Sequence, residues 1–187
     1  ARIGILVANF SSDSNRLSPK NVVETPTRVF DLLEFQLKRF PKPNAFAQKI
    51  KGSWRTYSTA ESTAIIRDLA WGLSLLGVRK GDRIANSTET NRPEWNFIDN
   101  AVMSLGAVHV PIYPNNCVEE FAFILKDSET KLIFVSGDHL FRLVSNLRPT
   151  LHHLEGIYTY DPVEDAPAWQ SIRTAGAAGL VEPENRH

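Results

Sequence analysis

Short apolar runs alternate with amphipathic stretches through most of this chain, at intervals of about 24 residues. Runs at 83–87, 107–112, 131–135 and 156–160 are short enough to be strands, and the stretches between them carry apolar residues at helical spacing. Antiparallel hairpins need far fewer residues between strands, whereas this interval accommodates a crossover helix and two short loops. The alternation therefore predicts an α/β fold with a mostly parallel sheet, right-handed crossovers and helices on its faces.

A helix and a β-hairpin are expected ahead of the sheet. Thr25 is a suitable N-cap for the helix, Pro26 fits its first position, and Pro41 ends it. Two strand-like runs then flank residues 51–53, where a glycine supplies the turn geometry of a hairpin. The sheet is thus expected to follow an α-helix and an antiparallel pair of strands.

Several further helix boundaries are marked by capping residues. Side chains that accept a hydrogen bond from the first free backbone N–H groups favour helix starts, and glycine favours helix ends. A glutamate three residues after the cap strengthens two of the starts, as in a capping box. The expected N-caps are Ser58, Asn91 and Asn116, and the expected helix stops are Gly77 and Gly106.

The chain divides into three segments on this interpretation. Residues 1–24 form an extension or linker, because 9–24 are polar and lack periodicity. Residues 25–173 form the α/β domain, with one short helix near Trp169. Glycine and alanine, and then charged residues, make 174–187 a flexible tail.

Composition excludes several classes of function. The 21 Lys and Arg residues balance 21 Asp and Glu residues, whereas a protein that binds nucleic acid through bulk charge is basic. The single Cys117 excludes an internal disulfide and a multi-cysteine metal site, and it fits a reducing compartment. No run approaches the roughly 18 apolar residues of a membrane-spanning helix. We expect a cytoplasmic protein without a nucleic-acid partner, with peripheral contact at a membrane left open.

Motifs that cradle nucleotide phosphates or position a nucleophile are missing from these 187 residues. The sequence holds no Gly-x-Gly-x-x-Gly, no phosphate-binding Gly-x-x-x-x-Gly-Lys, no Gly-x-Ser-x-Gly and no His-Glu-x-x-His. In open α/β sheets, ligands lie beyond the carboxyl ends of strands, so the loops at 88–91, 113–116 and 136–139 are the candidate sites. Within them, Asp138 and His139 form either an acid–base pair or, by our preference, a solvated helix start.

Other chemistry-bearing residues have simpler structural explanations. Adjacent histidines point in different directions, aromatic residues on helix faces pack in cores, and a lone thiol in a first helical turn is more often incidental than nucleophilic. We therefore assign no catalytic, cofactor-binding or metal-binding residue. The residues considered and set aside are His152, His153, Trp71, Trp95 and Cys117.

Four sequence pieces occur in order and at close spacing. They are Arg-Thr-Tyr-Ser at 55–58, Gly-Val-Arg-Lys-Gly-Asp-Arg-Ile-Ala at 77–85, Asn-Arg-Pro-Glu-Trp at 91–95 and Leu-Gly-Ala-Val-His-Val-Pro-Ile-Tyr-Pro at 105–114. Together they resemble the N-terminal region of the AMP-forming acyl-CoA synthetases of the adenylate-forming superfamily. The amino-acid sequences of these pieces are most similar to those of long-chain fatty-acid–CoA ligases. The resemblance implies that the chain is a partial N-terminal subdomain of such an enzyme.

The resemblance implies a two-step reaction for the parent enzyme. A fatty acid and Mg·ATP give an acyl-adenylate and pyrophosphate, and CoA then displaces AMP to give the thioester. The family uses a Ser/Thr/Gly-rich phosphate loop, an adenine motif, a ribose-binding Asp and a catalytic Lys, and none of these occurs here. We therefore expect a fragment that binds no cofactor and is inactive alone, with the rest of the enzyme as its partner.

Two alternatives remain open from the residues alone. The chain is either part of a ligase or a stand-alone binding or regulatory module with the same scaffold, and an unrelated flavodoxin-like domain is disfavoured by the early hairpin. A cut fragment exposes apolar surface that drives association. We accordingly expect a homo-oligomer, with residues 3–7 as a candidate pairing strand.

Overall fold

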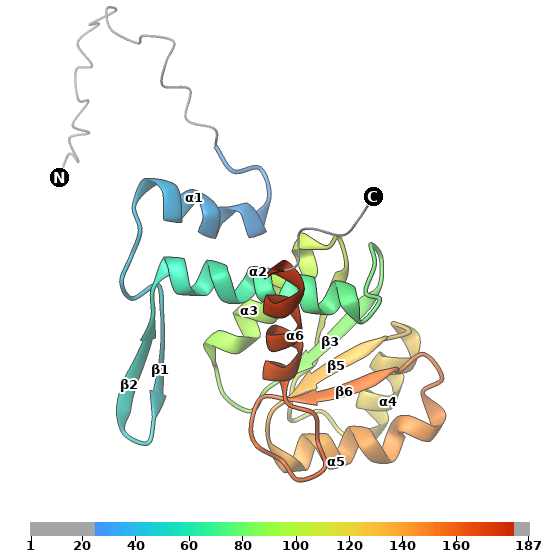
Figure 1. Ribbon diagram of the computed structural model, residues 1–187. Coiled ribbons are helices and arrows are strands. Elements are labelled where there is room, and N and C mark those ends of the chain that lie inside the picture. Colours follow the sequence, from blue (N-terminus) through green and yellow to red (C-terminus); the bar gives the residue numbers. More distant parts are fainter. Residues whose placement is uncertain (1–24, 182–187) are drawn as a thin grey trace, which may run out of the picture.

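The computed structural model describes residues 25–181 and shows an α/β fold built on a parallel sheet (Figure 1). The four strands lie in the order β4-β3-β5-β6, and every neighbouring pair is parallel. The expected fold class is therefore confirmed. The strands are β3 (Arg83–Ser87), β4 (Val108–Pro111), β5 (Leu132–Val135) and β6 (Gly156–Thr159).

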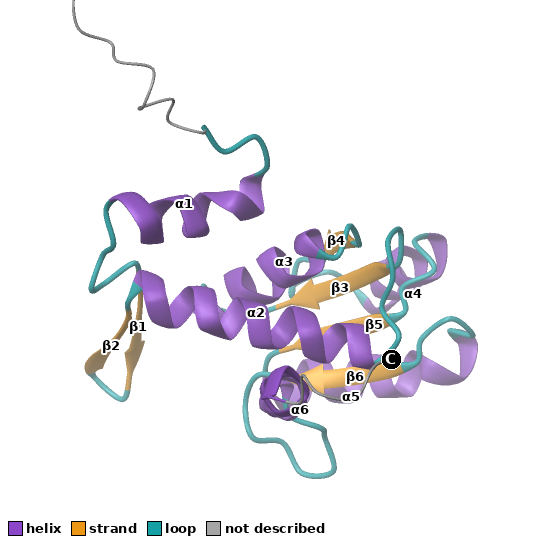
Figure 2. Cartoon of the chain, turned by 45° about the horizontal axis from the view of Figure 1, so that its top comes forward, coloured by secondary structure: helices purple, strands orange, loops and turns teal. Residues whose placement is uncertain are grey.

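Helices cover both faces of this sheet (Figure 2). One buried cluster joins α2, α3 and α6 to side chains such as Ile84 and Phe134, and the other joins α4 and α5 to Ala85 and Ile133. Successive strand residues thus serve opposite faces, as the period of two requires. The helices are α2 (Thr59–Leu75), α3 (Pro93–Ser104), α4 (Val118–Asp127), α5 (Gly137–Leu147) and α6 (Trp169–Val181), with the 3-10 helix η2 (Arg148–Thr150).

Helix α6 corrects the prediction of a flexible tail from residue 174. It continues to Val181, and its small residues allow close packing on α2. A Cβ atom on Gly176 would lie 1.8 Å from the Asp68 carbonyl oxygen, and one on Gly72 would lie 2.1 Å from that of Ile172. The glycines that suggested flexibility instead let two helix backbones meet, which local composition does not reveal.

The segment before α2 consists of the 3-10 helix η1 (Val29–Asp31), α1 (Leu32–Arg39) and a hairpin of β1 (Phe46–Ile50) and β2 (Ser53–Tyr57). The hairpin prediction is confirmed: Lys51 at φ 47° and Gly52 at φ 87° form its two-residue turn. The helix prediction placed the start too early, since helical structure begins at Val29 rather than beside Thr25. The expected pairing strand at residues 3–7 lies outside the described residues.

The helix ends at glycine were predicted more accurately than the positions of the helix N-caps. Gly77 and Gly106 both adopt positive φ, and in each case the following residue donates back to the last helical turn. Ser58 caps α2 by accepting from the Glu61 N–H. The expected caps Asn91 and Asn116 are wrong by one residue. Pro93 takes the first helical position, and the Glu120 carboxylate accepts from the Cys117 N–H, so Arg92 and Cys117 are the capping residues.

No helix within residues 25–181 is both long and apolar enough to cross a membrane.

Candidate functional site

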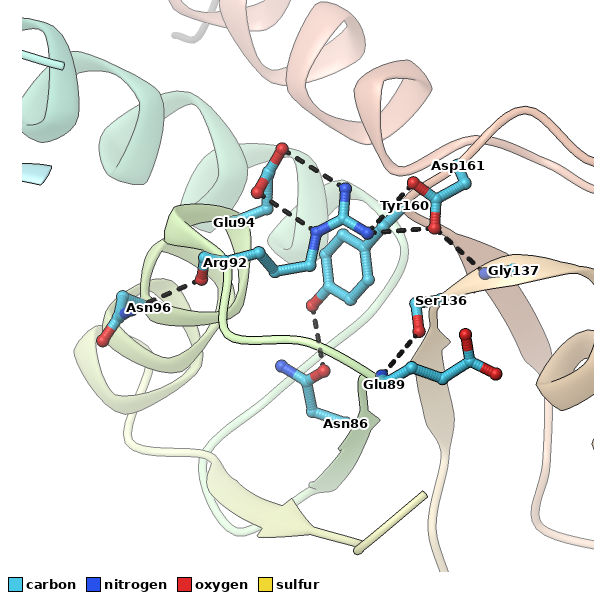
Figure 3. Close-up of polar contacts among 9 residues, drawn as sticks. All are labelled: Asn86, Glu89, Arg92, Glu94, Asn96, Ser136, Gly137, Tyr160 and Asp161. Atoms are coloured by element: carbon cyan, nitrogen blue, oxygen red, sulfur yellow. Dashed lines mark hydrogen bonds and ion pairs between the residues drawn. The ribbon is translucent and has the colours of Figure 1, made fainter. Parts of the chain in front are cut away.

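Three loops meet where β3, β5 and β6 end (Figure 3). Parallel strands share a carboxyl edge, and that edge is where open α/β sheets bind ligands. Their side chains and backbone form one polar network, which we call the carboxyl-edge cluster. Its members are Asn86, Glu89, Arg92, Glu94, Ser136, Gly137, Tyr160 and Asp161.

Arg92 lies at the centre of the cluster, and only 7% of its side chain is exposed. Its Nη1 contacts both carboxylate oxygens of Asp161, at 3.1 and 3.0 Å, and its Nε lies 3.2 Å from Glu94 Oε2. Burial by itself lowers the pKa of Arg92, but the hydrogen bonds to the two carboxylates outweigh it and raise the pKa above its ordinary value. The guanidinium is therefore a permanent charge that joins the α3 start to the loop after β6.

Tyr160 lies against Arg92 and reaches across the sheet. The guanidinium carbon is 4.8 Å from the ring centroid, and the hydroxyl donates to Asn86 Oδ1 at 3.1 Å. Burial raises the pKa of Tyr160 well above its ordinary value, although the hydrogen bond to Asn86 and the charge of Arg92 oppose this rise. The phenol is thus a neutral donor that links β6 to β3.

The backbone of the loop after β5 completes the network. Asp161 Oδ2 accepts from the Gly137 N–H at 3.0 Å, which places a carboxylate at the N-terminus of α5, where the helix dipole favours it. Ser136 Oγ accepts from the Glu89 N–H at 2.9 Å and so ties the loop after β3 to the same point. The three loops are therefore fixed relative to one another.

This arrangement does not fit the phosphates of a nucleotide. Phosphate sites present unpaired N–H donors and positive charge. Here the single guanidinium is shared by the carboxylates of Glu94 and Asp161, so the group is net negative, and the first N–H of α5 is already occupied. The cluster therefore holds the three loops of this edge together and offers no free donors to a phosphate.

Two neighbouring polar atoms on β3 have no hydrogen-bond partner within the described part of the chain. They are Asn86 Nδ2 and Ser87 Oγ, and both residues are 1% exposed. Buried polar atoms nearly always have a hydrogen-bond partner. The hydrogen bonding of this edge is therefore incomplete at these two atoms. Asn86 was not predicted as a site residue, although two polar residues at the end of an otherwise buried strand were a usable signal.

The loop at 136–139 contributes backbone rather than acid–base chemistry. Asp138 is 64% exposed and pairs with Arg142 at 3.0 Å, while His139 is exposed. The preferred interpretation, a solvated helix start, agrees with these positions. In the loop at 113–116, Tyr113 is 77% exposed.

The remaining candidates lie apart from the cluster. Trp71 is 37% exposed rather than in the core, and Trp95 is half-buried with its ring edge-on to His109, at 4.8 Å between centroids. Phe97, two residues along α3, fills the core position instead. Cys117 is exposed.

The two adjacent histidines line a pocket of about 220 Å³ with residues of α4 and η2. It lies at the opposite edge of the sheet from the cluster, beside Lys126, Glu129 and Thr150. Residues 25–181 contain no group of three His, Cys, Asp or Glu side chains placed to hold a metal ion. His152 and His153 thus line a surface pocket.

Residues 33–185 match the sequence profile of the family described as AMP-binding enzyme. This stretch is most of the 187 residues. The chain belongs to the AMP-binding enzyme family. The resemblance inferred from the four sequence pieces is confirmed, and the cluster of this AMP-binding chain is built partly from one of them, through Arg92 and Glu94.

Relatives of this AMP-binding chain include both long and short proteins. It is 37% identical over 102 residues to long-chain-fatty-acid–CoA ligase FadD15 of Mycobacterium bovis, an alignment covering 54% of this chain and 17% of the ligase. It is 25% identical over 138 residues to the uncharacterized protein Rv1549 of Mycobacterium tuberculosis, covering 74% of this chain and 77% of that protein. The chain thus spans less than a fifth of the long-chain ligase that it matches.

A solved structure shares the fold. The anthranilate CoA ligase AuaEII, crystallised with anthranoyl-AMP, superposes with a TM-score of 0.68 at 23% identity, covering 78% of this chain and 27% of AuaEII. At that identity the likeness supports the fold of this AMP-binding chain and nothing about its ligands.

Proposed function

We propose that this chain provides the N-terminal scaffold of a long-chain fatty-acid–CoA ligase. The alignment with FadD15 at 37% identity is the observation that carries this proposal. The parent enzyme would use ATP, Mg²⁺ and CoA to convert a fatty acid into its thioester by way of the acyl-adenylate. The scaffold would contribute the parallel sheet and the locked carboxyl edge, and the downstream part of the ligase would be its partner.

We further propose that the chain alone has no ligase activity. The sequence lacks the phosphate loop, and the only buried guanidinium of the described edge is neutralised by two carboxylates. Neither the charge nor the free donors that a triphosphate requires are supplied.

The test is an assay of the purified chain for ATP–pyrophosphate exchange and for thioester formation with a long-chain fatty acid. Full-length FadD15 is the positive control. We expect no exchange above buffer for the chain alone, and exchange for full-length FadD15. Exchange by these 187 residues unaided would end the proposal of inactivity.

A second candidate function is a stand-alone binding or regulatory module. The observation that favours it is the alignment with Rv1549, which covers about as large a share of that protein as of this chain. Reading the DNA beyond the codon for His187 separates the candidates. An in-frame phosphate loop supports the ligase scaffold, and an immediate stop codon supports the module.

Self-association is a further part of the proposal. Large apolar side chains are exposed on several elements, and such surfaces drive association when they are contiguous. We expect a dimer or larger assembly in light scattering, and a clean monomer at high concentration contradicts this. The most exposed examples are Tyr113, Trp54, Phe123 and Val29.

We also propose a cytoplasmic location with contact at a membrane surface, because long-chain fatty acids are themselves held in bilayers by their buried CH₂ groups.

A further inference from the structure

The pocket beside η2 lies apart from the carboxyl-edge cluster, at the amino edge of the sheet. Two segments line it: the end of α4 with the turn after it, at 125–130, and η2 with the turn that leads into β6, at 150–154. We call this space, of about 220 Å³, the amino-edge pocket. A cavity of about 150 Å³ between aliphatic side chains is enough to bind benzene, so this pocket has room for a compact molecule of one ring.

The inner wall of the amino-edge pocket is apolar. It is formed by Leu125, Leu151 and Leu154, and all three residues are buried. They belong to the hydrophobic cluster that joins α4 and α5 to one face of the sheet. A molecule in the pocket would therefore place an apolar surface against the core of the protein, as ligands do in most small-molecule sites.

The rim of the pocket carries two polar groups that are free to bind a ligand. Lys126 and His152 are exposed, and neither side chain has a carboxylate or hydrogen-bond partner in the part of the chain that the structure describes. Glu129, the carboxylate among the lining residues, is already held, because its Oε2 lies 2.6 Å from Arg83 Nη2 and its Oε1 lies 3.9 Å from His153 Nε2. The free groups are therefore an ammonium and an imidazole, which favour an anionic partner.

The C-terminus of α4, which borders the pocket, does not exclude an anion. Helix C-termini favour cations through carbonyl groups that lack a partner within the helix. Here the Leu125 carbonyl oxygen accepts from the Thr130 N–H at 3.1 Å, and that of Lys126 accepts from the Glu129 N–H at 3.1 Å. The ammonium of Lys126, in the last turn, also offsets the negative end of the helix dipole.

We propose that the amino-edge pocket binds a compact organic anion, about one ring in size. Its apolar body lies on the three leucines, and its carboxylate or phosphate group lies at Lys126 and His152. Inorganic phosphate matches only the rim, and a neutral hydrocarbon matches only the wall. Because the ligand contacts both lining segments, its binding stabilises the folded chain.

The experiment titrates the full 187-residue chain with benzoate and with phenyl phosphate, followed by amide NMR shifts and by thermal melting. We expect the shifts to concentrate at residues 125–130 and 150–154, and the melting temperature to rise with the concentration of the anion. Benzyl alcohol has the ring without the charge, and inorganic phosphate has the charge without the ring. Each should bind at least about tenfold more weakly than the matching anion. The tighter of the two anions identifies the preferred head group.

Variants of the rim test the two polar groups. Lys126→Gln removes a charged donor and should weaken the binding of both anions by about tenfold, and His152→Gln should weaken it in the same direction. Lys49→Gln on β1 and His139→Gln on α5 change residues that are equally exposed but lie outside the pocket, so they should leave binding unchanged. All four changes are on the surface, and circular dichroism confirms that each variant folds.

Three results contradict the proposal. Benzyl alcohol binding as tightly as benzoate overturns the assignment of an anion, and inorganic phosphate binding as tightly as phenyl phosphate overturns the role of the leucines. No amide shift at the pocket with either anion, or unchanged binding by both rim variants, overturns the site itself. None of these results touches the ligase scaffold, which ATP–pyrophosphate exchange tests separately.

Discussion

Residues 25–58 and residues 59–181 are stabilised in different ways. No residue from Thr25 to Ser58 is buried, whereas the helices and strands that follow build two buried clusters on either side of the sheet. A helix and hairpin can thus be well formed by turn geometry and helix signals without a core of their own. The first region depends on the second for its position.

Two sets of contacts attach the first region to the second. Phe46 and Tyr57 place their rings edge-on to Phe97. Thr59, the first buried residue, donates to Gln36 Oε1 at 2.8 Å and accepts from the Lys42 N–H at 3.0 Å. Besides these two sets of contacts, α1 packs on α2 and Arg55 pairs with Glu61.

Phe97→Ala is expected to have the largest effect, because it removes a fully buried ring that serves both regions. A Phe-to-Ala change in a core lowers the free energy of unfolding by about 4 kcal/mol. Urea unfolding followed by circular dichroism measures the loss. Phe123→Ala, which truncates an exposed ring on α4, is the control and should change stability by less than about 0.5 kcal/mol. Similar losses for both variants would contradict the assignment of Phe97 to the core.

Gly176→Ala tests the close approach of α6 to α2 within the buried region. The new methyl group would meet backbone atoms rather than a movable side chain, so the helices must separate. We expect a loss of about 3 kcal/mol in the same unfolding measurement. Ala178→Ser, at an exposed position of α6, serves as the reference and should be nearly neutral. A neutral Gly176→Ala would mean that α6 does not pack as described.

Asp82→Asn, at the amino edge of the sheet, is expected to lower the free energy of unfolding by a smaller and pH-dependent amount. Burial by itself raises the pKa of Asp82, but hydrogen bonds from the Arg79 N–H and Lys131 outweigh it, so the pKa lies below its ordinary value. A carboxyl group with a lowered folded pKa stabilises the protein above its unfolded pKa, and this stabilisation is lost as pH falls through the folded value.

Because the Asp82 side chain is partly exposed, the variant should lower the free energy of unfolding by only about 1 kcal/mol near neutral pH. This difference should vanish in acid. Thermal melts of wild type and variant across pH 7 to about 3 measure this. Asp127→Asn on α4 is the control. A cost that persists unchanged in acid would show that the side chain acts by shape rather than charge.

Gly52→Ala is expected to have the smallest global effect. Gly52 has φ +87°, which alanine adopts only with strain of about 1 kcal/mol, but no atom lies near the new methyl group. Hydrogen exchange of the β1 and β2 amides should accelerate while global unfolding shifts by less than about 0.5 kcal/mol. Ser53→Ala at the same turn is the comparison. A global loss as large as that of Gly176→Ala would place the hairpin in the cooperative core.

Local signals were sufficient where neighbouring residues decide the structure. Gly77, Gly106 and the turn at Lys51-Gly52 were predictable because positive φ is a local requirement. The N-caps of α3 and α4 were placed one residue early, because Pro93 and Glu120 fix the first turns more strongly than the asparagines do. Phe97 was missed because Trp95 is the larger aromatic residue, and only the packing shows which of them faces the sheet.

The candidate site could not be predicted from the sequence in the same way. The loops after the strands were predicted as the ligand-binding edge, but Arg92 and Asp161 are 69 residues apart and nothing local pairs them. Likewise, the glycines of α6 suggested a flexible segment, because the sequence does not show that α2 packs against them.

The sequence by itself determined the alternation of strands and helices, the hairpin turn, the glycine stops and the family, since each depends on short-range geometry or on motif wording. The tertiary structure alone decided the strand order β4-β3-β5-β6, the length of α6 and the charge balance of the carboxyl-edge cluster. The physical reason is that pairing, close helix contact and the neutralisation of a buried charge depend on residues distant in sequence, which only folding brings within a few ångströms.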